Sequence, residues 1–392
     1  MNSFKRIIIL SIVGCSILSL SSNTYAETKN MKSNQKTASQ LTYIDTETIP
    51  YQTKYKGASI GGLSGIDYDP KSNTWLMISD DRSEKDHARF YEAHINYNKQ
   101  QFNHIKFTQM HYLKQPDKTT YPNKNDFTSE SNHAVADPES IRVNPLNNHQ
   151  ILYTSEGDRE LGLNPFIRIA SKNGDFISEI PIHTPLKMDH QNKQGFRNNL
   201  ALEGSTFTED GKHIWASMEA PIIQDDQLPT TNSGSHTRLT QYNRQGDTIS
   251  EIAYPLDAIP QKPGKNKEAE NGIAEILMLN EKELLILERA SVQNNNNQFK
   301  NDIRIYKADV TSGTNIKNMN SIQNHKISPV KKHLIANLNE QDVGHIDNIE
   351  GMTFGPKLPN GHDILVLISD NNFNNKQQTN LIAFDVEPTD EK

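Results

Sequence analysis

The sequence predicts an all-β fold, a β-propeller made of four-stranded antiparallel blades. Segments of roughly 5 to 8 β-branched or aromatic residues alternate with Gly, Pro, Asn or Asp, the pattern of strands and turns. These segments recur as five similar groups after residue 40. No amphipathic helix longer than about two turns is evident, so a two-domain α/β fold lacks its helices. A closed ring of sheets explains the repetition and hides the sheet edges.

Each group begins with a short apolar strand start that contains the key position of the repeat. In chain order, these positions are Ser64, Glu139, Glu203, Glu275 and Glu350. The next strand ends in an acid, and these acids are Asp80, Glu156, Glu219, Glu288 and Asp370. The third strand begins with arginine in four groups, at Arg89, Arg168, Arg238 and Arg304. With a fourth strand readable after most of them, the groups predict five blades; the pattern also admits six or seven, with insertions hiding degenerate copies.

The ends of the repeat region indicate how the ring closes. Residues 41–50 form an extra strand before the first group, whereas the last group ends at Val386 without a fourth strand. We therefore expect the N-terminal strand to complete the final blade. Groups of about 70 residues exceed the roughly 40–50 residues of compact propeller repeats, so the surplus is expected in polar loops. These loops cover residues 115–136, 187–199, 222–235 and 291–301.

The first 26 residues have the order of a secretory signal. Lys5 and Arg6 precede an apolar run over residues 7–20, and small polar residues lead to Ala26. Cleavage after Ala26 would export the chain to the periplasm or the medium. The alternative is a lipoprotein signal, Ile-Val-Gly-Cys, in which Cys15 would be acylated. The apolar run continues beyond Cys15 and favours plain cleavage.

Removal of residues 1–26 changes the chemistry of the chain. It removes the only Cys, so no disulfide is expected. It also removes two of the 41 basic residues and none of the 48 acidic ones, which changes the net charge from −7 to −9. An acidic chain argues against a nucleic-acid partner, and no later segment reaches the about 18 apolar residues of a membrane span. We expect a flexible tail over 27–40, one propeller domain over 41–388, and a monomer.

The acids of the repeats should lie around one end of the central channel. In an antiparallel blade, the start of the innermost strand and the end of its neighbour lie at the same edge. Carboxylates at close range must be protonated, paired with cations or bridged by a metal. A hard cation such as Ca²⁺, which takes about 6–8 oxygen ligands, suits this inventory. The expected metal ligands are Asp80, Glu139, Glu203, Glu275, Glu350 and Asp370.

Further roles are predicted at the same mouth. Glu203 and Glu350 are the expected catalytic carboxylates, assisting an ion-bound water. Arg82, Arg159 and Arg289 follow acidic strand ends and could present their guanidinium groups to a phosphate or carboxylate of the substrate. The alternative for the acids at the strand ends is structural, with the arginine of the third strand forming a buried pair in each blade. No complete motif of serine hydrolases, zinc enzymes or nucleotide-binding loops is present.

Six phrases of the chain are similar to a known family. They are Gly62-Leu63-Ser64-Gly65-Ile66, Asp137-Pro138-Glu139-Ser140-Ile141, Leu202-Glu203-Gly204, Asn271-Gly272-Ile273-Ala274-Glu275, Asn348-Ile349-Glu350-Gly351-Met352 and Leu367-Ile368-Ser369-Asp370-Asn371-Asn372. They resemble the bacterial phytase-like family, labelled "esterase-like activity of phytase", from about residue 55 to 386. The resemblance implies a secreted or periplasmic propeller with phosphoester or ester hydrolase activity. Established propeller phytases similar to it use calcium to position water and the substrate phosphate.

Two functions from different classes follow from this reasoning. The first is an exported hydrolase that depends on a divalent cation and acts on a small-molecule ester or phosphoester at the acidic mouth. The second is a non-catalytic propeller that binds a ligand, a glycan or an envelope partner through its long loops. A Ca²⁺-assisted lactonase-type propeller is a third interpretation of the same residues.

Overall fold

The structure, a computed structural model, describes residues 36–130, 133–191 and 193–389. The predicted signal segment 1–26 lies outside these residues, as do residues 27–35 of the predicted tail. In the described part the regular elements are β-strands and two short 3-10 helices. No helix there is long and apolar enough to cross a membrane.

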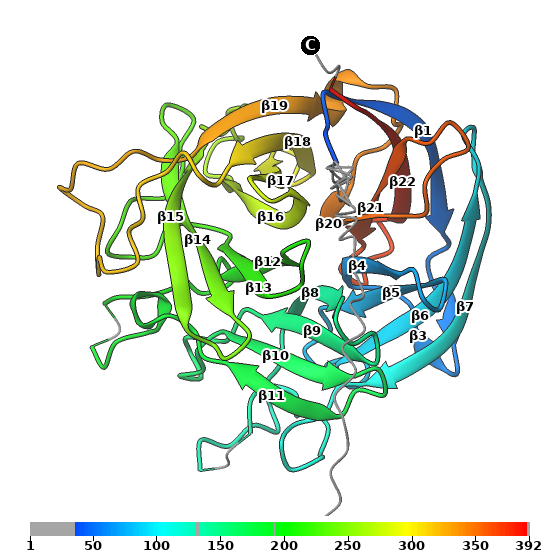
Figure 1. Ribbon diagram of the computed structural model, residues 1–392. Helices are drawn as coiled ribbons and strands as arrows, with labels where there is room; N and C mark the ends of the chain where they lie inside the picture. The colour runs from blue at the N-terminus through cyan, green and yellow to red at the C-terminus, as the bar shows by residue number, and fades with distance from the viewer. Residues whose placement is uncertain (1–35, 131–132, 192, 390–392) are drawn as a thin grey trace, which may run out of the picture. The chain divides into compact units, whose positions relative to one another are not determined.

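Five four-stranded antiparallel sheets, the blades, are arranged around a common axis (Figure 1). Blade 1 contains β4 (Leu63–Asp69), β5 (Thr74–Ser79), β6 (Arg89–Tyr97) and β7 (Phe102–Tyr112). Blade 2 contains β8 (Pro138–Val143), β9 (Gln150–Ser155), β10 (Phe166–Ser171) and β11 (Phe176–Ile180). Blade 3 contains β12 (Leu202–Phe207), β13 (His213–Met218), β14 (Ser235–Asn243) and β15 (Thr248–Leu256).

The last two blades complete the ring. Blade 4 contains β16 (Ala269–Asn280), β17 (Glu283–Gln293), β18 (Phe299–Asp309) and β19 (Lys331–Asn337). Blade 5 contains β20 (Asn348–Phe354), β21 (Asp363–Asp370), β22 (Thr379–Glu387) and β1 (Gln40–Ile49). The remaining elements are the hairpin of β2 (Lys54–Tyr55) and β3 (Ala58–Ser59), and the helices η1 (Thr184–Leu186) and η2 (Leu338–Glu340). The predicted propeller and its count of five blades are confirmed.

The N-terminal strand closes the last blade, as predicted. β1 pairs antiparallel with β22, with Leu41 opposite Val386 and Ile49 opposite Thr379. The propeller also begins slightly before the expected boundary at residue 41. Ala38 is fully buried, and its carbonyl oxygen accepts a hydrogen bond from Nζ of Lys307. The part of the predicted tail that the structure describes, residues 36–40, therefore packs against blade 4 through the buried Ala38 and its hydrogen bond to Lys307.

The hydrophobic core is divided into clusters that lie between neighbouring blades. Met77 of blade 1 and Val366 of blade 5 share one cluster, and Leu285 of blade 4 and Leu367 of blade 5 share another. Three more clusters join blades 1 and 2, blades 2 and 3, and blades 3 and 4. Each blade thus buries both faces against its neighbours, which is why consecutive residues of the inner strands, such as β5 and β21, are buried. Closure of the ring buries the inner strands on both faces, while the outermost strands, such as β7 and β11, stay partly exposed.

The innermost strands β4, β8, β12, β16 and β20 contact one another around the axis. Each of them has a register shift against the second strand of its blade, which in four blades lies at its first residues and in the longer β16 lies between Ile273 and Glu275. Such a bulge gives the strand an unpaired residue and redirects its side chain. The five bulges lie at the same end of the channel, and they build the site described next.

Candidate functional site

The bulges and the adjoining strand ends place two rings of side chains at the mouth of the channel. In blades 1, 2, 3 and 5 the bulge residues are Ser64, Glu139, Glu203 and Glu350. The residues at the matching end of the second strand are Asp80, Glu156, Glu219 and Asp370. The predicted gathering of these acids at one mouth is therefore what the structure shows for four of the five blades. The fourth blade differs.

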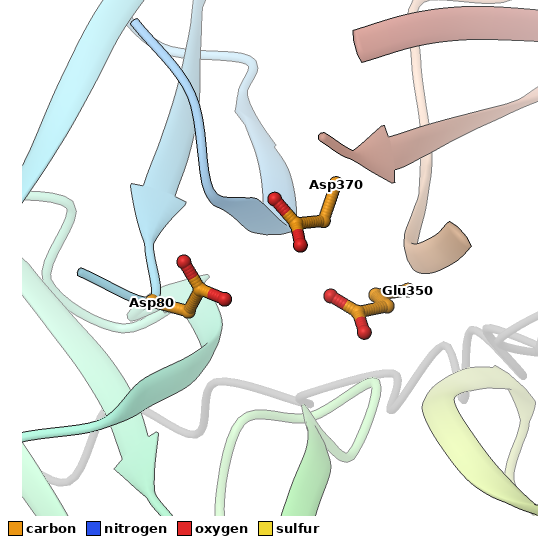
Figure 2. Close-up of side chains that lie close together, drawn as sticks. All are labelled: Asp80, Glu350 and Asp370. Carbon is orange, nitrogen blue, oxygen red and sulfur yellow. The ribbon is translucent and has the colours of Figure 1, made fainter. Parts of the chain in front are cut away.

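Carboxylates of the mouth form three groups in which one oxygen from each residue lies within 4.8 Å of the others. The groups are Asp80 with Glu350 and Asp370, Asp137 with Glu139 and Glu156, and Glu156 with Glu203 and Glu219. Figure 2 shows the first group, in which residues from blades 1 and 5 point toward a shared space. Oxygen donors at such spacing are what a hard divalent cation requires.

Burial and mutual repulsion both oppose ionisation of these carboxyl groups. Burial, with the charge of Asp137, raises the pKa of Glu156 to about 8. Burial, with the charge of Glu350, raises the pKa of Asp370 to about 8. Burial likewise raises the pKa of Glu203, and the charges of Glu219 and Glu156 add to the effect. Without a cation, the mouth therefore holds protons at neutral pH that ordinary carboxylates have released.

Two arginines supply positive charge at the mouth, and both were predicted to bind substrate. Arg82 lies 2.5 Å from Asp137 and donates to the side-chain oxygen of Asn199 at 2.6 Å. Arg289 lies 3.3 Å from Glu219 and 3.6 Å from Glu350. Two guanidinium groups cannot neutralise the eight carboxylates of the three groups, so the mouth has a surplus of negative charge.

The fourth blade shows that the predicted alignment of its repeat was shifted by one residue. Ile273 pairs with Glu288, as Leu63 pairs with Ser79 in blade 1. The bulge residue of blade 4 is therefore Ala274 rather than Glu275. Successive side chains of a strand point to opposite sides, so a shift of one residue turns Glu275 away from the mouth.

Glu288 is displaced from the mouth for the same reason, and Arg289 takes the position of the acid. The carboxylate of Glu288 is fully buried beside blade 3, where it accepts hydrogen bonds from Tyr254 and Asn271. Blade 4 thus contributes a cation where the other four contribute an acid. This substitution makes the mouth asymmetric.

Glu275 instead lies deeper in the channel, where it pairs with Arg142. The guanidinium Nη2 of Arg142 is 2.7 Å from Oε2 of Glu275, and both side chains are almost fully buried. The other carboxylate oxygen accepts a hydrogen bond from the backbone N–H of Ser205. Glu275 therefore belongs to a salt bridge and to none of the three carboxylate groups.

Arg142 of blade 2 also binds the innermost strands of all the other blades. Its guanidinium donates to the backbone carbonyl oxygens of Ile66, Ser205, Ile276 and Met352. We call Arg142 and Glu275 the hub. The repeat positions equivalent to Glu275 carry Gly or Ser, and a Cβ added to Gly204 would come within 2.8 Å of the Cα of Glu275. The small residues leave room for one large side chain, which fills the middle of the channel.

The arginines of the third strands do not neutralise the mouth; the structural alternative holds only in blade 4, where Arg304 lies 3.8 Å from Glu288, an acid that is itself displaced from the mouth. Arg89 pairs with Asp81 at 2.8 Å rather than with Asp80. Arg238 pairs with Asp225 and Glu251, and Arg168 with Glu179. In blade 1 the arginine lies opposite Ser79, the residue before the mouth acid, and so on the other face of the sheet. These arginines hold loops and outer strands, and the mouth acids are left to other cations.

The sequence of most of the propeller matches a known family. The family model described as "Phytase-like: Esterase-like activity of phytase" matches residues 58–373. The chain belongs to this family. The resemblance seen in the repeat phrases is thereby confirmed. The match covers the first four blades and the inner two strands of blade 5 of the phytase-like propeller, and it leaves out β1 and β22.

Comparisons with other proteins gave the following matches. The comparison with curated proteins found none. Among solved structures, an endo-arabinase from Bacteroides thetaiotaomicron is 11% identical with a TM-score of 0.41, covering 88% of this chain and 98% of its own. The catalytic domain of a Coprinopsis cinerea α-L-arabinofuranosidase is 8% identical with a TM-score of 0.41, covering 88% and 97%. A thermostable family-43 glycoside hydrolase is 12% identical with a TM-score of 0.38, covering 88% and 98%.

One of the predicted substrate-binding residues of the phytase-like propeller lies apart from the mouth acids. Arg159 donates to the backbone carbonyl oxygens of Gln194 and Phe196. Its guanidinium also lies over the ring of Phe196, 5.1 Å from the centroid. Arg159 thus anchors the loop over residues 187–199, which brings Asn199 to the mouth.

Sequence reasoning missed several residues of the mouth. Asp137, Glu270, Asn199 and Asn372 line the same cavity of about 210 Å³ as the predicted acids. Asp137 stands two residues before the bulge of blade 2, where no other repeat has an acid at the equivalent place. Glu270 belongs to the extended start of β16. A search for acids outside the repeat positions but next to strand starts would have found both.

Proposed function

We propose that this phytase-like propeller is an exported hydrolase of a small-molecule ester or phosphoester, and that it depends on a divalent cation, Ca²⁺ being the first choice. The observation that carries the proposal is the set of three carboxylate groups, crowded within 4.8 Å and short of positive charge. Export is proposed from residues 1–26, which the structure does not describe. Cation dependence is proposed from the donor set, which consists of oxygen atoms only.

The residues at the mouth fit a hard cation. Asp80, Glu350 and Asp370 would hold one ion, and Oδ2 of Asp370 is buried with no hydrogen-bond partner in the described chain. The group of Glu156, Glu203 and Glu219 would hold another. A bound divalent cation supplies Lewis acidity and lowers the pKa of a bound water.

The chain's own groups would divide the remaining work at the mouth. Burial and the charges of Glu219 and Glu156 raise the pKa of Glu203, which favours the protonated form that a general acid needs. Arg82 and Arg289 would orient an anionic or carbonyl oxygen of the substrate. The hub closes the middle of the channel, so substrate and product would enter and leave by the mouth.

Turnover with and without a cation tests this proposal. The purified chain would be assayed on p-nitrophenyl phosphate and p-nitrophenyl acetate, with Ca²⁺ or with a chelator. We expect Ca²⁺-dependent hydrolysis of one of the two, and a loss of at least about 100-fold in kcat for the double variant Glu203→Gln, Glu350→Gln. The matched control is Glu209→Gln, Glu281→Gln, which neutralises two exposed glutamates in the turns at the opposite channel end.

Each outcome of this assay has a clear meaning. Activity that persists in the chelator would contradict the role of the cation. No turnover of either ester, with Ca²⁺ present and the fold intact, would contradict hydrolysis and favour the non-catalytic binding propeller. Equal losses in the mouth variant and in its control would show that the effect is not specific to the mouth.

A further inference from the structure

Blade 4 extends beyond the mouth and forms a wall beside it. The second strands of blades 1, 2 and 3 end at Ser79, Ser155 and Met218, the level that Glu288 occupies in blade 4. β17 continues past this level to Gln293, and β18 begins at Phe299 to pair with it. The sequence had predicted a loop over residues 291–301, and this prediction was wrong at both ends. Cross-strand pairing extends the hairpin there and leaves only a short turn.

This wall borders a polar cleft that adjoins the mouth. The cleft has a volume of about 1030 Å³ and shares Asn199, Glu270, Arg289, Glu350 and Asn372 with the mouth cavity. Asparagine is the commonest residue of its lining, and the wall and the loop after β21 both contribute. Side-chain amides offer a hydrogen-bond donor and an acceptor side by side. The cleft is therefore able to bind groups that both donate and accept.

Two side chains of the lining are buried yet have no partner within the described chain. Ser291 and Asn301 are each 8% exposed and lie opposite one another in β17 and β18. Within the described residues their side-chain polar atoms make no hydrogen bond, and these atoms are not among the polar atoms closed off from solvent, so they are reached from the cleft. They line the cleft, so a ligand or water in it must satisfy them. The two side chains therefore offer hydrogen-bonding groups to a ligand in the cleft.

An exposed aromatic ring lies next to this pair. Phe299 is 55% exposed although it is a phenylalanine in a strand. It stands two residues before Asn301, and so on the same face of β18. An aromatic face beside hydrogen-bonding groups suits a ligand that has an apolar side as well as polar edges.

We propose that this cleft binds an uncharged carbohydrate chain. Sugar hydroxyl groups donate and accept together, as the amides require, and the C–H face of a sugar ring can stack on Phe299. A polyanion fits less well, because three acids, Glu270, Asp347 and Glu350, line the cleft. Arg289 is paired with acids, which leaves Lys376 and the ring of His345 as the other basic groups of the lining. On the proposed function, and resting on it, the substrate is a saccharide that carries the ester or phosphoester into the mouth.

Direct binding tests the cleft without any reference to turnover. The purified chain would be titrated by calorimetry with cello-, malto-, xylo- and N-acetylchito-oligosaccharides, in a chelator so that no cation or hydrolysis contributes. We expect one class to bind with a Kd of about 1 mM or tighter. Asn301→Leu and Phe299→Ala should each weaken that binding by at least about tenfold. Leu334→Ala removes an exposed apolar side chain from the outer strand of the same blade and should bind like the parent.

Three results would overturn the inference. No class of oligosaccharide binds at about 10 mM, an affinity too weak for a built site. Binding occurs but neither cleft variant changes it while both keep the parent's thermal unfolding. Dextran sulfate binds and the neutral chains do not, which would place a polyanion in the cleft. Because hydrolysis is not measured, failure of saccharide binding would leave the hydrolase proposal standing. Saccharide binding without ester turnover would contradict only the hydrolase proposal.

Discussion

The mouth and the hub lie in the same channel and both contain buried carboxylates, but the hub carboxylate is paired with a cation whereas most mouth carboxylates are not. At the hub, Glu275 meets Arg142 at 2.7 Å and also accepts backbone hydrogen bonds. At the mouth, three groups of carboxylates share two arginines. Buried charge that is fully paired holds a structure together, whereas an excess of one sign is costly unless something else binds. The difference separates a structural device from a candidate ligand site.

Loss of Arg142 should have the largest effect on stability. The variant Arg142→Met leaves Glu275 buried without its cation and the carbonyl groups of four blades without their donor. Breaking a buried pair from one side typically costs about 3–5 kcal/mol, so urea unfolding should show a loss of that size. The double variant Arg142→Met, Glu275→Gln should lose less than the sum of the two single losses. A loss under about 1 kcal/mol for Arg142→Met would show that the hub does not hold the blades together.

Calcium should stabilise the chain by an amount that grows with pH. Burial and repulsion raise the pKa of Glu156 to about 8 and that of Asp370 to about 8. The folded state then binds more protons than the unfolded state from about pH 4 to 8, so without a cation stability is lost as the pH rises through this range. A cation replaces those protons. At about 100 times its Kd it should add about 2.7 kcal/mol, and least at low pH.

Thermal unfolding at about pH 5 and about pH 8.5, with Ca²⁺ or chelator, measures this effect. Burial also raises the pKa of Glu275 to about 7 against the attraction of Arg142, so the hub contributes to the pH dependence as well. Only the part that Ca²⁺ restores belongs to the mouth. If Ca²⁺ shifts the midpoint equally at both pH values, protons and the cation do not compete there.

The repeats made the ring and most of the mouth predictable, but they did not show which residue of a repeat faces the mouth where the alignment shifts by one position. Five similar phrases fix the blades because strand period and turns are local properties of the chain. The sequence Ile273-Ala274-Glu275 offers a glutamate in the next register, and only the pairing of Ile273 with Glu288 shows which residue is the bulge. Two features of the sequence pointed to these exceptions. The arginine Arg142 within the apolar strand β8 pointed to a buried partner, and Arg289 directly after Glu288 pointed to a cation where the other blades have an acid.

Arg82 should decide between phosphoester and carboxylic ester by a smaller effect. Its guanidinium lies at the mouth beside Asp137, where it could pair with a phosphate dianion. Arg82→Gln should lower kcat/KM for p-nitrophenyl phosphate about tenfold, roughly 1.4 kcal/mol, and much more than for p-nitrophenyl acetate. Lys85→Gln, in the same loop but exposed, is the matched control. Equal losses on both esters would mean that Arg82 positions the acids rather than the substrate.

Neutralising one mouth acid should have the smallest effect, and its sign contrasts the mouth with the hub. Burial and the charges of Glu219 and Glu156 raise the pKa of Glu203, so its ionised form destabilises the cation-free fold. In a chelator at about pH 8, Glu203→Gln should therefore stabilise the chain by about 1 kcal/mol. Glu275→Gln, at the hub, should destabilise it, because it leaves the buried guanidinium of Arg142 without its carboxylate, and this loss outweighs the relief from a raised pKa. With Ca²⁺ the gain should vanish, because a ligand is lost. Glu209→Gln should change neither value, and a destabilised Glu203→Gln in the chelator would make the mouth a structural network like the hub.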